Sequence, residues 1–379
     1  MKIEPDQIHN FNAGPSVLAS SVKAKIHEAI ISIKGGPGIL ELSHRSSIFE
    51  KILTAAKQEI AKAYQLPDTH NILFLQGGAS LQFAMLAFNL GTNGGFINTG
   101  VWSQRAFAEA LKLTEYQSTR PVELWQGGDN DFRQVPKEIT LPQSVALNYL
   151  HLTSNNTIYG TQYRHLPAVL IPDSEKVKNF GNTPGWTIDA SSDLFAKQID
   201  WSKVDLLYGG AQKNAGPAGV TLVIGRKDLL LEKAKHPFCP KILEYRTHTE
   251  KDSLYHTPNT LGIFAVGQVA KWVNDQGGIA FMQSRAQKRS QMIYDIIDYH
   301  DVYQGHASPQ SRSTMNITFR GKNKNLESKF LEKAKALNMF GLKGHRSVGG
   351  LRASLYNAIT DESVSILCQL LETMAKERT

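Results

Sequence analysis

A single lysine in a glycine-rich stretch is the first residue whose setting indicates chemistry. Lys213 lies in YGGAQKNAGPAG at 208–219, between the apolar runs 204–207 and 220–224. An amine held in a pocket can form a Schiff base with an aldehyde cofactor, and the small residues beside Lys213 leave room for such a group. The ordinary alternative is a solvated loop lysine, because most lysines are exposed.

Two further features precede this lysine in the chain. Asp189 ends the apolar run WTID, and acids at the ends of strands in open α/β sheets often face a ligand. The stretch LFLQGGASLQF at 73–83 combines a strand, two glycines and a helix start, which favours phosphate binding at the amides of Ala79 and Ser80. It matches neither the Walker pattern nor GxGxxG. Each feature alone could also be purely structural, as a helix cap or a tight strand–helix turn.

Taken together, the three features match the needs of pyridoxal phosphate (PLP). This cofactor requires a lysine, an acid facing its pyridine nitrogen and a phosphate site. The acid favours the protonated ring nitrogen, which makes the ring an electron sink. We therefore predict a PLP enzyme with Lys213 and Asp189 as catalytic residues. Trp102, in NTGVWSQR, could stack on the ring, although a tryptophan after a strand more often lies in the core.

Two His-Arg pairs indicate anion recognition. His44 and Arg45 stand in ELSHRSS, whereas His345 and Arg346 stand in GHRSVGGLRAS, which also contains Arg352. Arginine binds carboxylates and phosphates in bidentate geometry. Either pair could instead be ordinary surface charge.

The elements that must position these residues alternate along the chain. Short apolar runs predict strands, and longer amphipathic stretches predict helices. The predicted strands are 71–75, 95–98, 144–150, 186–189, 204–208 and 220–224, and the predicted helices are 48–64, 80–89, 103–113 and 259–275. This alternation predicts an α/β fold with a parallel or mixed sheet covered by helices on both faces.

The pattern changes after a long basic helix predicted at 278–300. The later predicted elements are strands at 316–319 and 351–355 and helices at 325–337 and 361–376. We therefore predict a large domain at 1–275, which includes the N-terminal segment, and a small C-terminal α+β domain at 276–379.

Composition narrows the function classes. The chain has 379 residues, of which 41% are hydrophobic and 20% charged, as in ordinary globular proteins. Its two cysteines, Cys239 and Cys368, form no metal spacing or disulfide framework, so we expect a reducing, cytoplasmic setting. The N-terminus has no apolar core of a secretory signal, and no apolar run is long enough to span a membrane.

The formal net charge of +8 has two interpretations. A basic chain can bind nucleic acid, or it can attract anionic substrates. The basic residues are scattered, without a long Lys/Arg block or a zinc spacing, so we expect small anionic substrates and no nucleic acid. A nucleic-acid-binding protein would need no cofactor and would be colourless.

With these residues assembled, the chain resembles the phosphoserine aminotransferase family of the class V aminotransferases over essentially its whole length. The segments that carry the resemblance are FNAGPSVL, SHRSS, LQGGASLQF, TSNNTIYGTQ, DASSDLF, YGGAQKNAGPAG, TPNTLGIF and GHRSVGGLRASLYNA. The family implies PLP fold type I, with a mostly parallel seven-stranded sheet in the large domain, a small C-terminal domain, and a homodimer with active sites at its interface. It also implies amino transfer between phosphoserine and 2-oxoglutarate on one side and 3-phosphohydroxypyruvate and glutamate on the other. This reaction serves serine biosynthesis and, in many bacteria, pyridoxine biosynthesis.

The resemblance also implies roles for single residues. Lys213 resembles the Schiff-base lysine, Asp189 the partner of the ring nitrogen, and Trp102 the stacking residue. The other residues expected at the cofactor are Thr157 at the ring hydroxyl, Ala79, Ser80 and Gln212 at the phosphate, and Asn259 and Thr260 reaching that phosphate from the partner subunit. The residues expected at the substrate are Arg352 at the carboxylate and His44, Arg45, His345 and Arg346 at the phosphate.

One position departs from the family pattern, and other PLP enzymes remain as alternatives. Many family members have arginine where this chain has Ser80, which removes a cation near the substrate phosphate. A serine–glyoxylate type transaminase is one alternative. A cysteine desulfurase is another, but it needs a nucleophilic cysteine on an active-site loop, and neither Cys239 nor Cys368 is well placed for that role.

Overall fold

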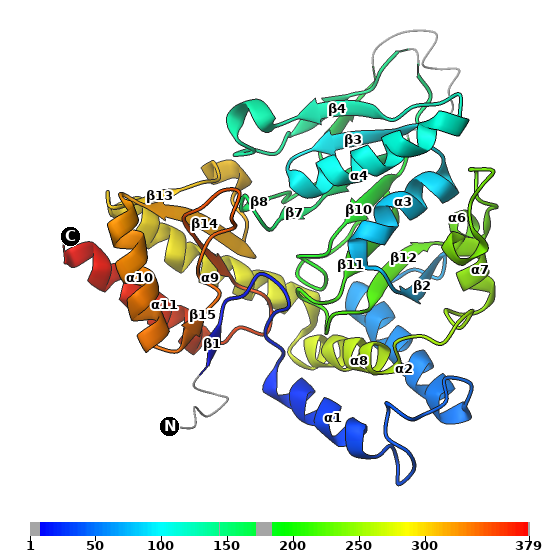
Figure 1. Cartoon of the computed structure of the whole chain (residues 1–379), viewed down its shortest axis with the longest axis horizontal. Helices are drawn as coiled ribbons and strands as arrows, with labels where there is room; N and C mark the ends of the chain where they lie inside the picture. The colour runs from blue at the N-terminus through cyan, green and yellow to red at the C-terminus, as the bar shows by residue number, and fades with distance from the viewer. Residues whose placement is uncertain (1–7, 144, 172–183, 378–379) are drawn as a thin grey trace.

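The computed structural model describes residues 8–143, 145–171 and 184–377. Its centre is a seven-stranded sheet in the order β2-β12-β11-β10-β6-β3-β4 (Figure 1). The strands are β2 (His70–Leu75), β3 (Gly94–Asn98), β4 (Val122–Gln126), β6 (Tyr149–Thr153), β10 (Trp186–Asp189), β11 (Val204–Gly210) and β12 (Thr221–Arg226). Only β12 is antiparallel to its neighbours in this sheet. The predicted mostly parallel seven-stranded sheet is confirmed.

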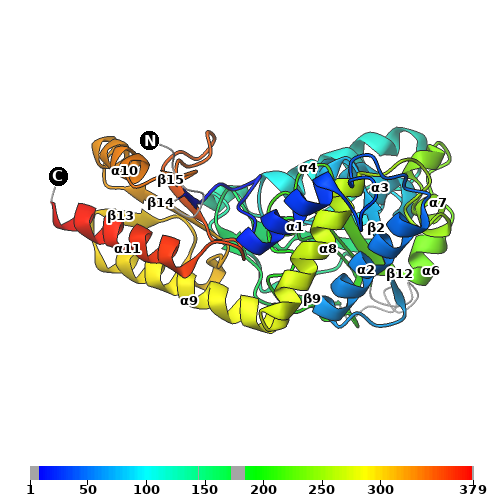
Figure 2. The same ribbon diagram turned by 90° about the horizontal axis from the view of Figure 1, so that it is seen from below.

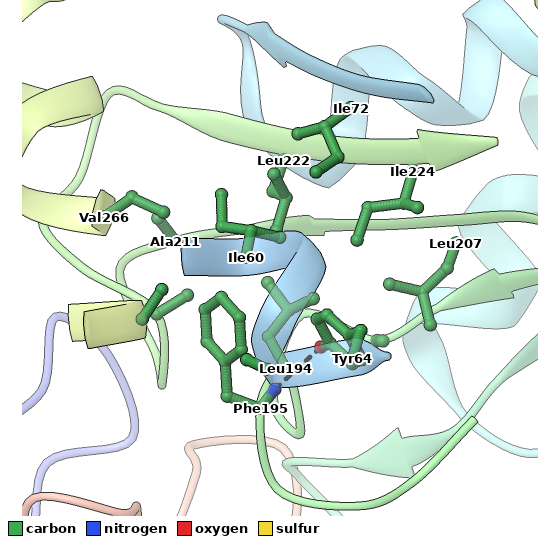
Figure 3. Close-up of a cluster of buried hydrophobic side chains, with 14 of the residues drawn as sticks. Ile60, Tyr64, Ile72, Leu194, Phe195, Leu207, Ala211, Leu222, Ile224 and Val266 are labelled. Atoms are coloured by element: carbon green, nitrogen blue, oxygen red, sulfur yellow. Dashed lines mark hydrogen bonds between the residues drawn. The ribbon is translucent and has the colours of Figure 1, made fainter. Parts of the chain in front are cut away.

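Helices cover both faces of this sheet, and the side-chain alternation of its strands assigns each residue to one face. Successive strand residues point to opposite faces, so Ile72 and Phe74 join a core with α2 (Ser47–Tyr64) and α8 (Thr260–Asp275). Figure 3 shows part of this core, where the Phe195 backbone N–H donates to the Tyr64 hydroxyl at 2.8 Å.

Leu73 and Leu75 point to the opposite face, where they pack with α3 (Gly78–Leu90) and α4 (Val101–Lys112). The central strands are therefore buried on both sides. This explains why they are continuous apolar runs rather than alternating ones.

The C-terminal part of the chain has a hydrophobic core of its own. A three-stranded sheet has the order β13-β14-β16, and the long helix α9 lies alongside α11 (Figure 2). The elements are α9 (Gly278–Tyr299), β13 (Tyr303–Gly305), β14 (Asn316–Gly321), α10 (Lys324–Ala336), β16 (Leu351–Ser354) and α11 (Asp361–Lys376). The N-terminal strand β1 (His9–Asn10) pairs with β15 (Met339–Phe340) beside this core. The domain division at residue 275 stays a prediction.

Most predicted elements agree with the structure to within three residues at each end, and one strand start is wrong. The strand predicted at 144–150 begins at Tyr149 instead, and Ser144 itself lies outside the described residues. Just before this start, the Asn148 side chain donates to the Leu90 carbonyl at 2.5 Å. The sequence prediction also missed α1 (Ser20–Ile31) and the edge strand β4.

No helix in the described part of the chain is both long and apolar enough to cross a membrane.

Candidate active site

The carboxyl ends of the parallel strands bring the predicted catalytic residues to one edge of the sheet. Asp189 ends β10 and is in register with Thr153 at the end of β6 and with Tyr208 of β11. Lys213 follows three residues after the end of β11. Ligands of open α/β folds bind at this edge, so Asp189 and Lys213 lie where a ligand is expected.

Asp189 is a buried carboxylate held by the turn that follows its strand. It is 3% exposed, and its Oδ1 accepts hydrogen bonds from the Ser191 backbone N–H at 3.0 Å and the Ser191 hydroxyl at 2.6 Å. Burial raises the pKa of Asp189, while the Lys213 charge and the two Ser191 bonds act against that rise. The second carboxylate oxygen has no partner among the described residues, so it can face a ligand cation.

The Lys213 amine lies among aromatic and polar groups. Its Nζ donates to the Thr157 hydroxyl at 2.8 Å and stands 5.3 Å from the centroid of the Trp102 ring. Burial lowers the pKa of Lys213 to about 8, against the opposing effect of Asp189 and with a smaller lowering from Arg352. An amine with this pKa is partly neutral near physiological pH, as a nucleophile or a general base must be.

This depressed pKa makes a prediction for the cofactor-free protein. Only a neutral amine reacts with acetic anhydride, so a lowered pKa moves its reactivity to lower pH. Trace acetylation followed by peptide mapping should give Lys213 a midpoint near pH 8, against ~10.4 for an unperturbed lysine. A midpoint above pH 10 would show that the amine is not desolvated.

Several buried polar atoms around Lys213 and Asp189 have no partner in the described part of the chain. They are Trp102 Nε1, Thr153 Oγ1 and Arg352 Nε. Buried polar groups are almost always hydrogen-bonded in native proteins, so such a set indicates a site for a polar ligand. A flat ring with a phenolic oxygen and a ring nitrogen suits Thr157, Trp102 and Asp189, and the site therefore fits PLP.

The predicted phosphate site lies at the same edge of the sheet. Gly77, with φ of 87°, precedes α3, and Ala79 and Ser80 lie in the first turn of that helix. No acidic residue occupies this turn, so its free N–H groups remain available to an anion. The register aligns Leu75 with Thr221 and Thr221 with Gly210. This turn therefore lies about two strand spacings, or ~10 Å, from the glycine-rich stretch 208–219 that contains Lys213 (the lysine loop).

One group of the predicted substrate residues gathers near Lys213. Arg352 donates from Nη1 to the Thr157 carbonyl at 3.2 Å, so Thr157 links it to the amine. Burial lowers the pKa of His345, and the charges of Arg352, Arg346 and Arg105 lower it further. Arg105, Arg346 and Arg352 therefore lie near one another. Arg105 was not predicted to belong to this group.

The other predicted substrate and phosphate residues lie near the starts of helices, and Asn259 also lies next to Gly219, where a Cβ would be 2.8 Å from its Nδ2. His44 and Arg45 precede α2, where the Arg45 N–H donates to the Ser43 hydroxyl at 3.2 Å. Asn259 caps α8 by accepting from the Gly262 N–H at 2.8 Å, and Thr260 donates to the Ile39 carbonyl at 2.9 Å. In the described residues, none of these four side chains contacts Lys213.

The N-terminal segment supports the lysine loop, a contact that was not predicted from the sequence. The Ser16 N–H donates to the Gln212 carbonyl at 2.9 Å, and the Ser16 hydroxyl donates to the Lys213 carbonyl. Gly14 has φ of 137°, and a Cβ there would lie 3.0 Å from Lys213 Cγ. The glycine-proline step in FNAGPS was the available signal for such a close approach.

Neither cysteine is suited to nucleophilic chemistry. Cys368 is buried in α11, and Cys239 is half-buried in the segment that follows β12. Burial raises the pKa of both thiols to about 11, whereas a nucleophilic cysteine has a lowered pKa. This argues against the cysteine desulfurase alternative.

Comparison with known proteins identifies the family of this chain. The model of the class-V aminotransferase family matches residues 8–367. Phosphoserine aminotransferase of Lysinibacillus sphaericus is 45% identical over 364 residues, covering 95% of each chain. The structure of phosphoserine aminotransferase from Bacillus circulans subsp. alkalophilus superposes with a TM-score of 0.89 at 37% identity, covering 99% of this chain and 100% of that one. PLP-bound phosphoserine aminotransferase from Trichomonas vaginalis superposes with a TM-score of 0.84 at 30% identity, covering 96% and 99%. The chain belongs to the class-V aminotransferase family and, within it, to the phosphoserine aminotransferases.

Proposed function

We propose that this enzyme reversibly transfers the amino group of phosphoserine to 2-oxoglutarate. The products are 3-phosphohydroxypyruvate and glutamate. The observation that carries the proposal is the placement of the half-buried Lys213 and the buried Asp189 beside Arg352 and its neighbouring arginines. Lys213 and Asp189 are the groups a PLP-dependent transaminase needs. The Arg346 and Arg352 guanidiniums, with His345 as a further hydrogen-bonding group, suit a substrate that carries both a carboxylate and a phosphate.

The cofactor of this transaminase is pyridoxal phosphate, and the fold is PLP fold type I. When bound, PLP supplies an electron sink for the electrons released at the substrate's Cα. We propose that Asp189 stabilises the positive charge on the ring nitrogen, because this residue is buried and only its Oδ1 accepts hydrogen bonds among the described residues. Trp102 would cover one face of the ring and exclude water there, while Thr157 would hydrogen-bond the ring oxygen.

We assign the movement of the proton to Lys213 Nζ. A general base must be neutral when it accepts the proton and close to the carbon that releases it. A pKa of about 8 leaves part of the amine neutral at physiological pH. The Thr157 hydroxyl, 2.8 Å away, orients this amine.

The phosphate of the cofactor and the phosphate of the substrate need separate sites. We assign the cofactor phosphate to the first turn of α3, at Ala79 and Ser80, and to Gln212 of the lysine loop. A phosphate dianion left without partners in a protein interior would cost several kcal/mol. We therefore assign the substrate phosphate to His345 and Arg346, and the substrate carboxylate to Arg352.

We propose a homodimer in which the partner subunit completes each site. Within one chain, His44 and Arg45 precede α2, and among the described residues neither makes a hydrogen bond or ion pair to Lys213. Apolar side chains are exposed in the same region, including Ile31 at 72% and Leu40 at 61%. Exposed apolar groups of this kind mark interaction surfaces. Pairing through this surface would bring His44, Arg45, Asn259 and Thr260 to the partner's site, and analytical ultracentrifugation would test it.

The substrate is tested most directly by an amino-transfer assay. Phosphoserine with 2-oxoglutarate should react much faster than unphosphorylated serine at equal concentration, because only the former has a charge that matches Arg346 and His345. Equal rates would favour a serine–glyoxylate type transaminase instead. We also propose a cytoplasmic role in serine biosynthesis. A phosphorylated pyridoxine precursor would fit the same cations, and the same assay with that precursor would test this branch.

The two arginine roles predict different losses. Arg346→Ala or Arg45→Ala should weaken the binding of phosphoserine by roughly 1.5–3 kcal/mol, the range for a hydrogen bond to a charged group. The glutamate half-reaction should change much less. Arg352→Ala should damage both half-reactions, since every amino-acid substrate has an α-carboxylate. Single-turnover measurements of each half-reaction would decide between them. Equal losses for phosphoserine and glutamate in Arg45→Ala and Arg346→Ala would leave those residues a structural role.

A further inference from the structure

Arg105 is a cation that lies beside the Trp102 ring at the edge of the site. It follows Trp102 by three residues in α4, a spacing that places both side chains on one face of the helix. Its Cζ lies 5.0 Å from the centroid of the Trp102 ring. Glu109, one turn further along, is 2.8 Å from Lys112 instead. Among the described residues, Arg105 makes no ion pair or hydrogen bond.

The Trp102 ring connects Arg105 to the reacting amine. Lys213 Nζ is 5.3 Å from the centroid of the same ring, so one indole is within cation–π range of both cations. A guanidinium held against an aromatic ring keeps its N–H groups free for an oxyanion. Stacking therefore fixes the position of Arg105 without using its donors.

Arg105 also lies with the cations of the C-terminal part of the chain. Together with Arg346 and Arg352, its charge lowers the pKa of His345, after the larger effect of burial. In the salt bridges of the described residues, no carboxylate pairs with Arg105, Arg346 or Arg352. Like charges that gather without counter-ions repel one another, so this arrangement is favourable only when an anion binds among them.

We propose that Arg105 binds the phosphate of the substrate and thereby contributes to the preference for a phosphorylated amino acid. This inference rests on the function proposed above. It supplies a positive charge from α4 at a site where Ser80, in the neighbouring helix α3, supplies none. The phosphorus of phosphoserine is three bonds from its Cα, so a cation at the rim of the ring stack is suitably placed for it.

The test compares three variants of the holoenzyme. Arg105→Gln removes the charge, Arg105→Lys retains it without the fork of donors, and Lys112→Gln is the matched control on the same helix. Each variant is assayed in single turnover with phosphoserine and with glutamate. Inorganic phosphate is then titrated as an inhibitor of each. Cofactor absorbance and thermal unfolding are recorded to confirm that each variant is folded and loaded.

We expect Arg105→Gln to raise the apparent Kd for phosphoserine, and the inhibition constant of phosphate, roughly 10- to 100-fold, as for the loss of a charged hydrogen bond. The glutamate half-reaction should change much less. Arg105→Lys should recover part of the loss, and Lys112→Gln should resemble the wild type.

Two outcomes would overturn the proposal. Equal losses with phosphoserine and glutamate would mean that Arg105 only supports Trp102, and an unchanged phosphate inhibition constant would mean that it binds no anion. Failure of the proposed function looks different, because the wild type would then not prefer phosphoserine to serine. In that case, inhibition by phosphate that Arg105→Gln weakens would still support an anion site at Arg105. A wild-type enzyme that phosphate does not inhibit would refute such a site.

Discussion

Replacing Lys213 with alanine is expected to abolish transamination while the protein stays folded. The change removes the only amine near Asp189 and Thr157 in the described part of the chain, and with it the group that moves the proton. A general base contributes ~10²–10⁴ in rate, and the covalent attachment of the cofactor is lost as well. We therefore expect turnover to fall at least about a thousandfold, measured in single turnover with phosphoserine.

The control for this variant is another lysine on the surface of the same part of the fold. Lys203 is 64% exposed and lies 3.3 Å from Asp200, so Lys203→Ala should retain activity. Circular dichroism and thermal unfolding would confirm that Lys213→Ala is folded. Borohydride reduction of the wild-type holoenzyme, followed by peptide mapping, should place the cofactor on Lys213. A label on any other lysine would end this assignment.

Replacing Asp189 with asparagine is expected to cause the second-largest loss, with the cofactor still bound. Asparagine keeps an oxygen that can accept from the Ser191 N–H and hydroxyl, so the turn after β10 is preserved. The negative charge that favours the protonated ring nitrogen is lost. The charge of Asp189 also opposes the burial effect on Lys213, so the pKa of Lys213 should fall below about 8. We expect turnover to fall by about two to four orders of magnitude.

Asp193→Asn is the matched control for this variant. Asp193 is also 3% exposed, but it accepts hydrogen bonds from Ser154 and from Gln162, and it pairs with Lys197 at 3.3 Å. Losing the charge of Asp193 should therefore lower the free energy of unfolding, while the turnover changes little. Thermal unfolding would measure the first effect, and stopped-flow measurement of both half-reactions would measure the second. Activity of Asp189→Asn near that of the wild type would show that another group supports the ring nitrogen.

The local sequence was sufficient to predict the two catalytic candidates and most of the elements that carry them. A buried parallel strand needs an unbroken apolar run, so WTID and VDLLY could be recognised without any long-range information. The residue after such a run lies at the edge where ligands bind. Asp189 and Lys213 were therefore predictable as neighbours of a ligand, although their roles stay predictions.

The elements that sequence reasoning missed are those with weak burial. The edge strand β4 has no fully buried residue, whereas β2 at the other edge of the sheet is almost fully buried and was predicted. An apolar pattern cannot indicate a strand whose side chains remain partly in water. α1 buries only Val22 and Ala29 of its residues, so its signal was weak for the same reason.

The composition of the site depended on contacts between distant segments, which only the tertiary structure decides. Gly14 and Ser16 reach the lysine loop across almost 200 residues, and Thr157 joins Lys213 to Arg352. The His-Arg motifs read alike in the sequence, but the fold places His345 beside Arg352 and leaves His44 near the start of α2. Arg105 had no recognisable motif, since its interaction with His345 joins residues 240 positions apart. The residues able to perform the chemistry could be predicted from short segments, because strand and helix propensities are local. Which of those charges share one pocket was decided by the fold, because electrostatic interactions depend on distance in space and not on separation along the chain.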